Sequence, residues 1–266
     1  EFLYQVISTT KYEKILFDLA NGSGQPNLSP DLIGLVKIPY PPLQEQKAIA
    51  HILSTFDEKI EVNNRINKTL EAMAQEIFKR WFVDFELPNE NGDPYKSSGG
   101  EMMESKMGMI PKGWGVVEIG SIIPVKDGTH ASPKAVPYGY PLITSKHLMS
   151  TKLDLNNANK ISKVDYEEVN KRSKVDRFDI LITMIGTVGN LYLVQDEIIN
   201  FAIKNIGLFK TSENLEIYEY IYCSLKTDFM KQYISERMAG STQQYISLGE
   251  LRKIPICLPM NLSLDI

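Results

Sequence analysis

The sequence predicts an α+β protein, in which a mixed, curved β-sheet domain with short helices is attached to a long coiled-coil-forming α-helix. Three observations lead to this prediction. Residues 43–85 contain neither glycine nor proline, whereas residues 110–266 alternate short apolar runs with turn-forming residues. Residues 1–40 resemble the last part of that second region. These patterns divide the chain into segments 1–42, 43–85, 86–109 and 110–266.

Residues 1–42 are interpreted as the C-terminal tail of a first domain of the same kind as residues 110–266. At an offset of 218 residues, the two segments match in apolar, glycine, glutamine and serine positions. Chance matching of degenerate apolar patterns is the alternative. The matched pairs include Leu3 with Ile221, Tyr4 with Tyr222, Gly22 with Gly240, Ser23 with Ser241, Gln25 with Gln243 and Ser29 with Ser247. We therefore expect one complete domain and the tail of another, joined by one helix.

The long helix is predicted over residues 43–85, after two prolines that suit a first helical turn. A heptad starting at Ile49 places apolar residues at seven of ten a and d positions. Such a seam is typical of a coiled coil, and the polar Asn63 within it would fix register. Some 38 helical residues span roughly 57 Å, which calls for a partner helix; one long helix packed in an ordinary domain is the alternative. The predicted subunit interface comprises Ile49, Ile52, Phe56, Asn63, Ile66, Leu70, Met73 and Ile77.

Residues 86–109 are rich in Pro, Asn, Gly and Ser and show no periodicity, which indicates a linker without core elements. Beyond residue 110, apolar runs predict strands and amphipathic runs predict helices. Strands are expected at 141–145, 178–186, 191–194, 206–210 and 254–259. Helices are expected at 165–172 and 217–238.

The composition of the chain excludes some classes of function and permits others. The chain has 266 residues and a net charge of −4, but the charge is uneven. Residues 1–104 hold 10 Lys and Arg against 16 Asp and Glu, whereas residues 105–266 hold 19 against 17. The mildly basic second part permits a DNA-binding face. No apolar run is long enough for a membrane span. The two cysteines lack a CxxC pattern, so we expect reduced, buried thiols and a cytoplasmic location.

The chain is predicted to be non-catalytic, without a metal or cofactor of its own. Its only catalytic pattern is Asp31 followed by Glu45 and Lys47, which fits the PD…(D/E)xK arrangement of metal-dependent nucleases. That chemistry needs the carboxylates and the lysine together on a strand. Glu45 and Lys47 fall instead on the first turn of the predicted helix, where residues i and i+2 face different directions. A stand-alone nuclease is therefore an unfavoured alternative.

Polar loops of the second domain are the candidate binding residues. Lys and small hydroxyl side chains suit phosphate oxygens, Gln and Asn can bond bidentately to adenine, and His can reach a base edge. A solvated surface loop is the alternative for each segment taken alone. The candidate DNA-binding residues are Lys126, Thr129, His130, Ser132, Lys134, Lys146, Lys204, Asn205, Thr242, Gln243, Gln244 and Tyr245.

Several runs, in this order, resemble the specificity subunit of Type I restriction–modification systems. The run PPLQEQKAIAHILSTFDEKIEVNNRINKTLEAMAQEIFKRWFVDFE, followed by GMIPKGWGVVEIGSI, resembles a central spacer that leads into a target recognition domain. Further runs resemble one subgroup of those domains: DGTHASPKAVPYGYPLITSKHL, INFAIKNIGLFK and GSTQQYISLGELRKIPICLP.

The resemblance implies a subunit with two recognition domains and two antiparallel spacer helices, each domain reading half of a split double-stranded DNA target. It also implies methyltransferase and restriction subunits as partners, which carry S-adenosylmethionine, ATP and Mg²⁺. This chain would read one half-site, and a second copy of it or another chain would supply the other half. A structural coiled-coil adaptor without a DNA role is the rival from another class.

Overall fold

The computed structural model describes residues 1–20, 27–149 and 152–260. The chain forms two compact units, Glu1–Met73 and Ala74–Ile266. The boundary falls inside the long helix, and not at the start of a linker. No helix in the described ranges combines the length and apolar character required to cross a membrane.

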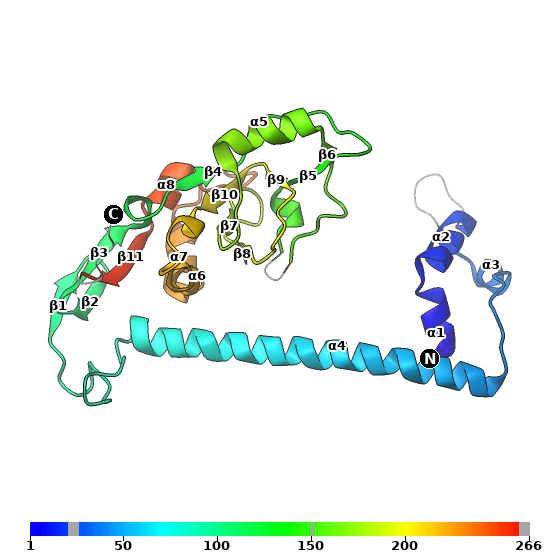
Figure 1. Cartoon of the computed structure of the whole chain (residues 1–266), viewed down its shortest axis with the longest axis horizontal. Helices are drawn as coiled ribbons and strands as arrows, with labels where there is room; N and C mark the ends of the chain where they lie inside the picture. The colour runs from blue at the N-terminus through cyan, green and yellow to red at the C-terminus, as the bar shows by residue number, and fades with distance from the viewer. Residues whose placement is uncertain (21–26, 150–151, 261–266) are drawn as a thin grey trace. The chain divides into compact units, whose positions relative to one another are not determined.

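The first unit consists of short helices and most of the long helix (Figure 1). The short helices are α1 (Phe2–Ile7), α2 (Thr10–Leu19) and α3 (Pro30–Gly34). Ser29 caps α3, since its side chain accepts a hydrogen bond from the Leu32 N–H at 3.3 Å. The buried Tyr12 donates its hydroxyl hydrogen to the Lys37 carbonyl at 3.1 Å, which ties α2 to the segment after α3.

The long helix is confirmed as α4 (Leu43–Phe78), a single element of 36 residues. A π-helical turn, Lys79–Val83, continues it. Phe85, at φ 59, lies in the left-handed region and ends the helical path. A helix of this length spans about 54 Å.

The predicted repeat appears as the same succession of helices in the second unit. There, α6 (Tyr218–Leu225), α7 (Asp228–Glu236) and α8 (Leu248–Arg252) follow at the offset seen in the sequence. The caps also repeat, because Ser247 accepts from the Glu250 N–H at 3.1 Å. Gly22, Ser23 and Gln25, which contributed to the sequence match, lie outside the described residues.

One continuous helix was expected over residues 217–238, and that prediction is wrong. The helix breaks after Leu225, and Thr227 caps a new one. Its hydroxyl oxygen accepts from the Met230 N–H at 3.3 Å and its hydroxyl donates to the Ser224 carbonyl at 2.7 Å. A threonine can satisfy the backbone groups left free at a helix start. The apolar periodicity did not reveal this break, because it continues through the turn.

The second unit contains a mixed set of sheets, as the predicted α+β class requires. An antiparallel sheet has the order β4-β10-β7-β8, and a second sheet, β6-β5-β9, pairs β5 with β9 in parallel. Strands β3 and β11 pair with each other. The bounds are β3 Trp114–Glu118, β4 Val125–Asp127, β5 Tyr140–Ile143, β6 Lys160–Ile161, β7 Ile180–Thr183, β8 Leu191–Leu193, β9 Ala202–Ile203, β10 Ile206–Phe209 and β11 Pro255–Pro259.

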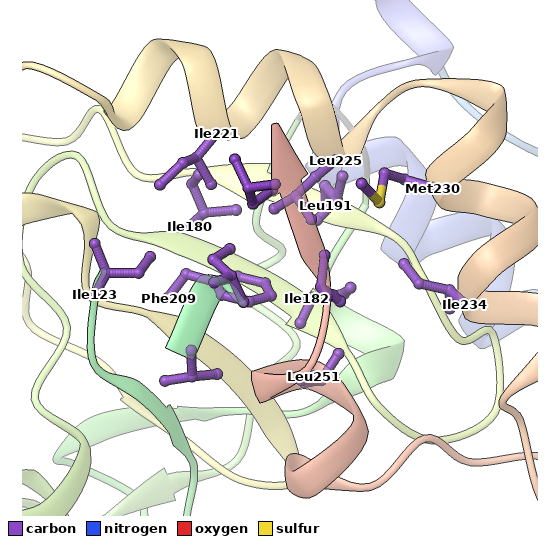
Figure 2. Close-up of a cluster of buried hydrophobic side chains, with 14 of the residues drawn as sticks. Ile123, Ile180, Ile182, Leu191, Phe209, Ile221, Leu225, Met230, Ile234 and Leu251 are labelled. Atoms are coloured by element: carbon purple, nitrogen blue, oxygen red, sulfur yellow. The ribbon is translucent and has the colours of Figure 1, made fainter. Parts of the chain in front are cut away.

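The core lies on both faces of the antiparallel sheet. Ile180 and Ile182 of β7 pack with the helices, as Figure 2 shows, whereas Leu181 packs in a separate cluster on the other face. Burial on both faces explains why β7 is a continuous apolar run and not an alternating one. The helices contribute Ile221, Leu225, Met230, Ile234 and Leu251 to the first cluster.

Residues 86–109 are not free of regular structure, contrary to the expectation of a plain linker. Strands β1 (Met102–Ser105) and β2 (Gly108–Pro111) form an antiparallel hairpin. Gly108, at φ 94, allows the chain to reverse there. Ile110 is buried with Phe85, but Met103 and Met109 are exposed. The hairpin therefore lacks the regular apolar alternation that would have predicted it.

Candidate nucleic-acid interface

The loop that follows β4 is fixed against the corner between β9 and β10. The Gly128 N–H donates to the Ile206 carbonyl at 2.8 Å, and the Thr129 N–H donates to the Ile203 carbonyl at 3.1 Å. A Cβ atom on Gly128 would lie 2.5 Å from the Ile203 oxygen. Only glycine allows the two backbones to approach so closely. Backbone hydrogen bonds therefore fix the position of this loop independently of its side-chain contacts.

Asp127, at the end of β4, is a buried carboxylate that faces two exposed side chains. Its Oδ2 lies 2.9 Å from Nε2 of His130, and its Oδ1 accepts a hydrogen bond from Nη2 of Arg172. The Asp127 side chain is 6% exposed, against 64% for His130 and 57% for Arg172. Arg172 comes from the last turn of α5 (Lys163–Ser173). One buried acid thus joins the loop to a helix 45 residues away in sequence.

The corner between β9 and β10 adds two of the predicted residues to this group. Asn205, at φ 53, places its Oδ1 2.8 Å from Nδ1 of His130. The neighbouring Lys204 donates from Nζ to Oγ of Ser132 at 2.5 Å. Asparagine tolerates the left-handed conformation that turns its side chain back toward the loop. Both ring nitrogens of His130 are engaged within the protein, so reaching a base edge would cost it an internal contact.

Next to this group lies an open hollow of about 330 Å³, whose walls combine polar and apolar atoms. Asn205 lines the hollow and also contacts His130, which pairs with Asp127. The hollow and the side chains around Asp127 therefore form one continuous surface. We call this surface the polar face. The hollow is lined by Thr144, Ser145, Lys146, Ile185, Gly186, Thr187, Asn205 and Gln243.

Gln243 reaches the hollow because its segment pairs with the turn after β7. The Gly186 N–H donates to the Gln244 carbonyl at 3.0 Å, and the Ile246 N–H donates to the Met184 carbonyl at 2.9 Å. Gly186 lies at φ 80, in the left-handed region, which lets the turn close beside the segment. Residues separated by more than 50 positions in the sequence are therefore held side by side by backbone hydrogen bonds.

Lys146 is held at the rim of the hollow by its neighbour His147. Nδ1 of His147 accepts a hydrogen bond from the Thr144 N–H at 3.0 Å, which caps the short 3₁₀ turn Ser145–His147. His147 is buried, and burial, together with the charge of Lys146, lowers its pKa below the ordinary 6.5. His147 is therefore a structural residue, and Lys146 is the exposed one.

Of the predicted site residues, the structure brings together His130, Ser132, Lys146, Lys204, Asn205 and Gln243 on the polar face. Thr129 instead stabilises its own turn, where Oγ1 accepts from the Ala131 N–H at 3.1 Å. Lys126 lies half-buried in β4, and within the described residues no hydrogen bond connects it or Lys134 to the polar face. Thr242, Gln244 and Tyr245 are exposed on the Gln243 segment.

The sequence prediction missed several residues of the polar face, namely Asp127, Thr144, Ser145, Arg172, Gly186 and Thr187. Asp127 had a signal, since it lies inside the polar run that supplied His130. Arg172 had none, because it resembles any solvated residue at the end of an amphipathic helix. Only the packing of α5 beside β4 and β9 reveals its place.

The chain matches a model of a known protein family. The family model described as "Type I restriction modification DNA specificity domain" matches residues 1–72 and 111–261. The chain belongs to this family. The unmatched residues 73–110 cover the end of α4, the π-helical turn and most of the β1–β2 hairpin.

Individual members of the family are similar over most of this chain. The MjaIX specificity subunit of Methanocaldococcus jannaschii is 29% identical over 265 residues, which cover 97% of this chain and 58% of that protein. The EcoBI specificity subunit of Escherichia coli is 25% identical over 231 residues, covering 84% of this chain and 48% of the relative. The chain thus spans about half to three-fifths of the length of these relatives.

The fold also matches a solved structure of the family. The Type I restriction–modification S subunit from M. genitalium aligns with a TM-score of 0.51 and 18% identity. The alignment covers 97% of this chain and 61% of that one. At this identity the match supports the fold alone.

The described ranges of this family member contain no group of three or more His, Cys, Asp or Glu side chains placed to hold a metal ion. Glu45 of the nuclease pattern lies in the first turn of α4, Lys47 follows two residues later on the same helix, and Asp31 lies in α3. The helical placement that argued against a nuclease is therefore observed.

The predicted interface residues form an exposed apolar stripe along α4. Within the described chain the large side chains are 48–61% exposed, and Ile49 is half-buried. Those exposed apolar side chains are Ile52, Phe56, Ile66, Leu70, Met73 and Ile77. Asn63 is exposed as well. A stripe of this kind on one helix usually marks a protein–protein contact.

Proposed function

We propose that this chain is a DNA sequence-specificity subunit of a Type I restriction–modification complex, and that its polar face reads one half of a bipartite double-stranded target. The observation that carries the proposal is the convergence of side chains from the loop after β4, α5, the β9–β10 corner and the Gln243 segment. The family membership gives this convergence its biological setting.

The chemistry of the polar face suits direct readout of bases. The side-chain amides of Asn205 and Gln243 can each donate to and accept from adenine in the major groove. Lys146 at the rim of the hollow can donate to guanine acceptors or to phosphate oxygens. The backbone contacts that hold these segments reduce the conformational entropy lost on binding.

The stripe on α4 is the proposed contact with partner protein. In this proposal a second helix of the same kind, from another chain or a second copy of this one, packs along Ile52, Phe56 and Ile66. The paired helices would set the distance between two half-sites, as dimer geometry does in other DNA-binding proteins. Methyltransferase subunits, and then restriction subunits, would dock on this assembly.

The chain is proposed to contribute recognition and no chemistry. S-adenosylmethionine, ATP and Mg²⁺ would bind to the partner subunits. Mg²⁺-dependent cleavage of DNA by the purified chain alone would contradict this division of roles.

The direct test is selection from randomised duplexes, with the chain mixed with Type I methyltransferase subunits from the same source. We expect a defined motif to be enriched, and Gln243→Ala to lose preference at one position of it. Binding to the motif and to a scrambled duplex should be compared at one salt concentration, because phosphate contacts depend strongly on salt.

The matched control is Gln232→Ala, since Gln232 is a glutamine on α7 that bonds to Glu236 and lies outside the polar face. We expect Gln232→Ala to leave the specificity ratio unchanged. An unchanged ratio for Gln243→Ala would remove that residue from the readout. Failure of the wild-type mixture to enrich any motif would favour an adaptor without a DNA role.

A further inference from the structure

Arg172 combines exposure with a fixed orientation, which is unusual for a surface arginine. Its side chain is 57% exposed, yet Nη2 donates to a carboxylate whose side chain is only 6% exposed. The neighbouring Lys171, also in the last turn of α5, instead bonds to Glu168 at 2.5 Å on the open surface. A guanidinium carries five N–H donors in a rigid plane, so one bond to Asp127 leaves the others available to a ligand.

The hydrogen bond from Arg172 to the Asp127 carboxylate holds this arginine in place. A buried carboxylate is costly unless it is paired and hydrogen-bonded. Asp127 meets that requirement with both oxygens, since Oδ1 accepts from Arg172 and Oδ2 faces His130. These contacts restrict the rotation of the Asp127 and Arg172 side chains. The close approach of Gly128 to Ile203 fixes the backbone next to Asp127.

The pairing with Asp127 also decides which kind of DNA contact Arg172 is suited to. A phosphate contact depends mainly on net charge, and the adjacent carboxylate offsets the charge of the guanidinium. The planar set of donors remains. A fixed planar donor set matches guanine, which presents the adjacent acceptors O6 and N7 in the major groove.

We propose that Arg172 reads a guanine of the DNA target in the major groove, and that Asp127 is a positioning residue that orients its guanidinium. This inference rests on the proposed function and adds a base and a residue to it. Good bidentate pairs discriminate against the wrong base by roughly 5- to 150-fold.

The test uses the full chain with its methyltransferase subunits and the motif obtained by selection. Arg172→Ala is expected to lose preference for guanine at one position by roughly 5- to 150-fold, with the other positions unchanged. Arg172→Lys keeps the charge but not the planar donor pair, so it is expected to lose the same preference. Asp127→Asn is expected to weaken that preference partly, because an amide cannot accept from both partners.

The salt dependence of binding separates this role from a phosphate contact. We expect the slope of log K against log salt for Arg172→Ala to equal that of the wild type, whereas loss of a phosphate contact at this position would lower it by about 0.9. Lys171→Ala is the matched control for charge at the same helix end, and it should leave every base preference intact.

Thermal melting of each variant shows whether it is folded, and Arg172→Lys supplies the reading if Arg172→Ala melts early. The inference alone is overturned if the wild type enriches a motif that contains no guanine. It is also overturned if Arg172→Lys retains the full preference, or if Lys171→Ala loses the same position. Enrichment of no motif at all by the wild type overturns the proposed function as well.

Discussion

The ammonium nitrogen of Lys210 lies 2.7 Å from Oδ2 of Asp179, and their side chains are 5% and 0% exposed. Lys210 also donates to Asp176 at 2.7 Å. Burial alone would lower the pKa of Lys210, but the hydrogen bonds to Asp176 and Asp179 outweigh it and raise the pKa above 10.5. Asp179 further accepts from the Ser212 N–H at 3.1 Å. This network joins the segment before β7 to the end of β10.

Lys210→Met is expected to destabilise the second unit strongly. Removing one partner of a buried pair leaves an uncompensated charge on Asp179, which costs about 3–5 kcal/mol. The control is Lys174→Met, since Lys174 pairs with Asp176 but is 67% exposed and is expected to cost at most about 1 kcal/mol. Chemical denaturation measures both. Equal losses for the two variants would contradict the proposed importance of the buried pair.

Ile66→Asp is expected to abolish self-association or partner binding through α4. The side chain is 48% exposed in the described chain and lies at a d position of the predicted seam. A charge there would have to be buried against the partner helix. Light scattering should give a mass above 30.2 kDa for the wild type, alone or with its partner, and a lower mass for the variant.

Lys68→Asp is the control for this prediction, because it introduces the same residue at a heptad position on the opposite side of the helix. It should assemble as the wild type does. If Lys68→Asp disrupts assembly as much as Ile66→Asp, the seam is not the contact surface.

Acidification is expected to destabilise the second unit through His147. Burial lowers its pKa in the folded state, so between that pKa and the ordinary 6.5 the unfolded chain binds more protons. The free energy of unfolding therefore rises with pH in this window. The contribution is complete above 6.5 and is lost as the pH falls through the folded-state pKa. Denaturation at several pH values measures it.

His147→Gln removes the titrating group and should flatten the pH dependence in that window. The variant also tests the role of the Nδ1 contact with Thr144, which holds the turn that carries Lys146. A pH profile identical to that of the wild type would show that another group controls acid stability.

The two thiols are expected to react slowly in the native protein. Burial raises the pKa of Cys257 to about 11 and also raises the pKa of Cys223. Thiolate is the reactive form, so little of it exists near pH 8. A colorimetric thiol assay should find slow labelling in buffer and labelling of two cysteines in denaturant. Rapid labelling of Cys257 in the native protein would contradict its burial.

The sequence predicted the elements whose signals are local or periodic. The run from Leu43 to Phe78 is a helix because nothing in it interrupts helical hydrogen bonding. The apolar runs around Ile182 and Leu208 are strands because both faces of the sheet are covered. The repeat was visible because apolar, glycine, glutamine and serine positions recur at a constant offset, and the matched serines Ser29 and Ser247 both cap helices.

Predictions based on local signals failed where a side chain or a distant segment decided the structure. Thr227 ends one helix and starts another within a run whose apolar period continues. The β1–β2 hairpin forms beside Phe85, and its own sequence carries no alternation. In both cases hydrogen bonds or packing overrode the periodic pattern.

The sequence by itself determined the fold class, the long α4 helix with its apolar stripe, and the polar segments from which the candidate site is drawn. Only the tertiary structure decided which of those polar residues meet. His130, Asn205 and Gln243 are far apart in the chain, and strand pairing together with the close approach at Gly128 brings them to one surface. The same packing places Arg172 over the buried Asp127. Such a contact leaves no local trace in sequence, because a helix-end arginine has the same pattern whether it faces water or a carboxylate.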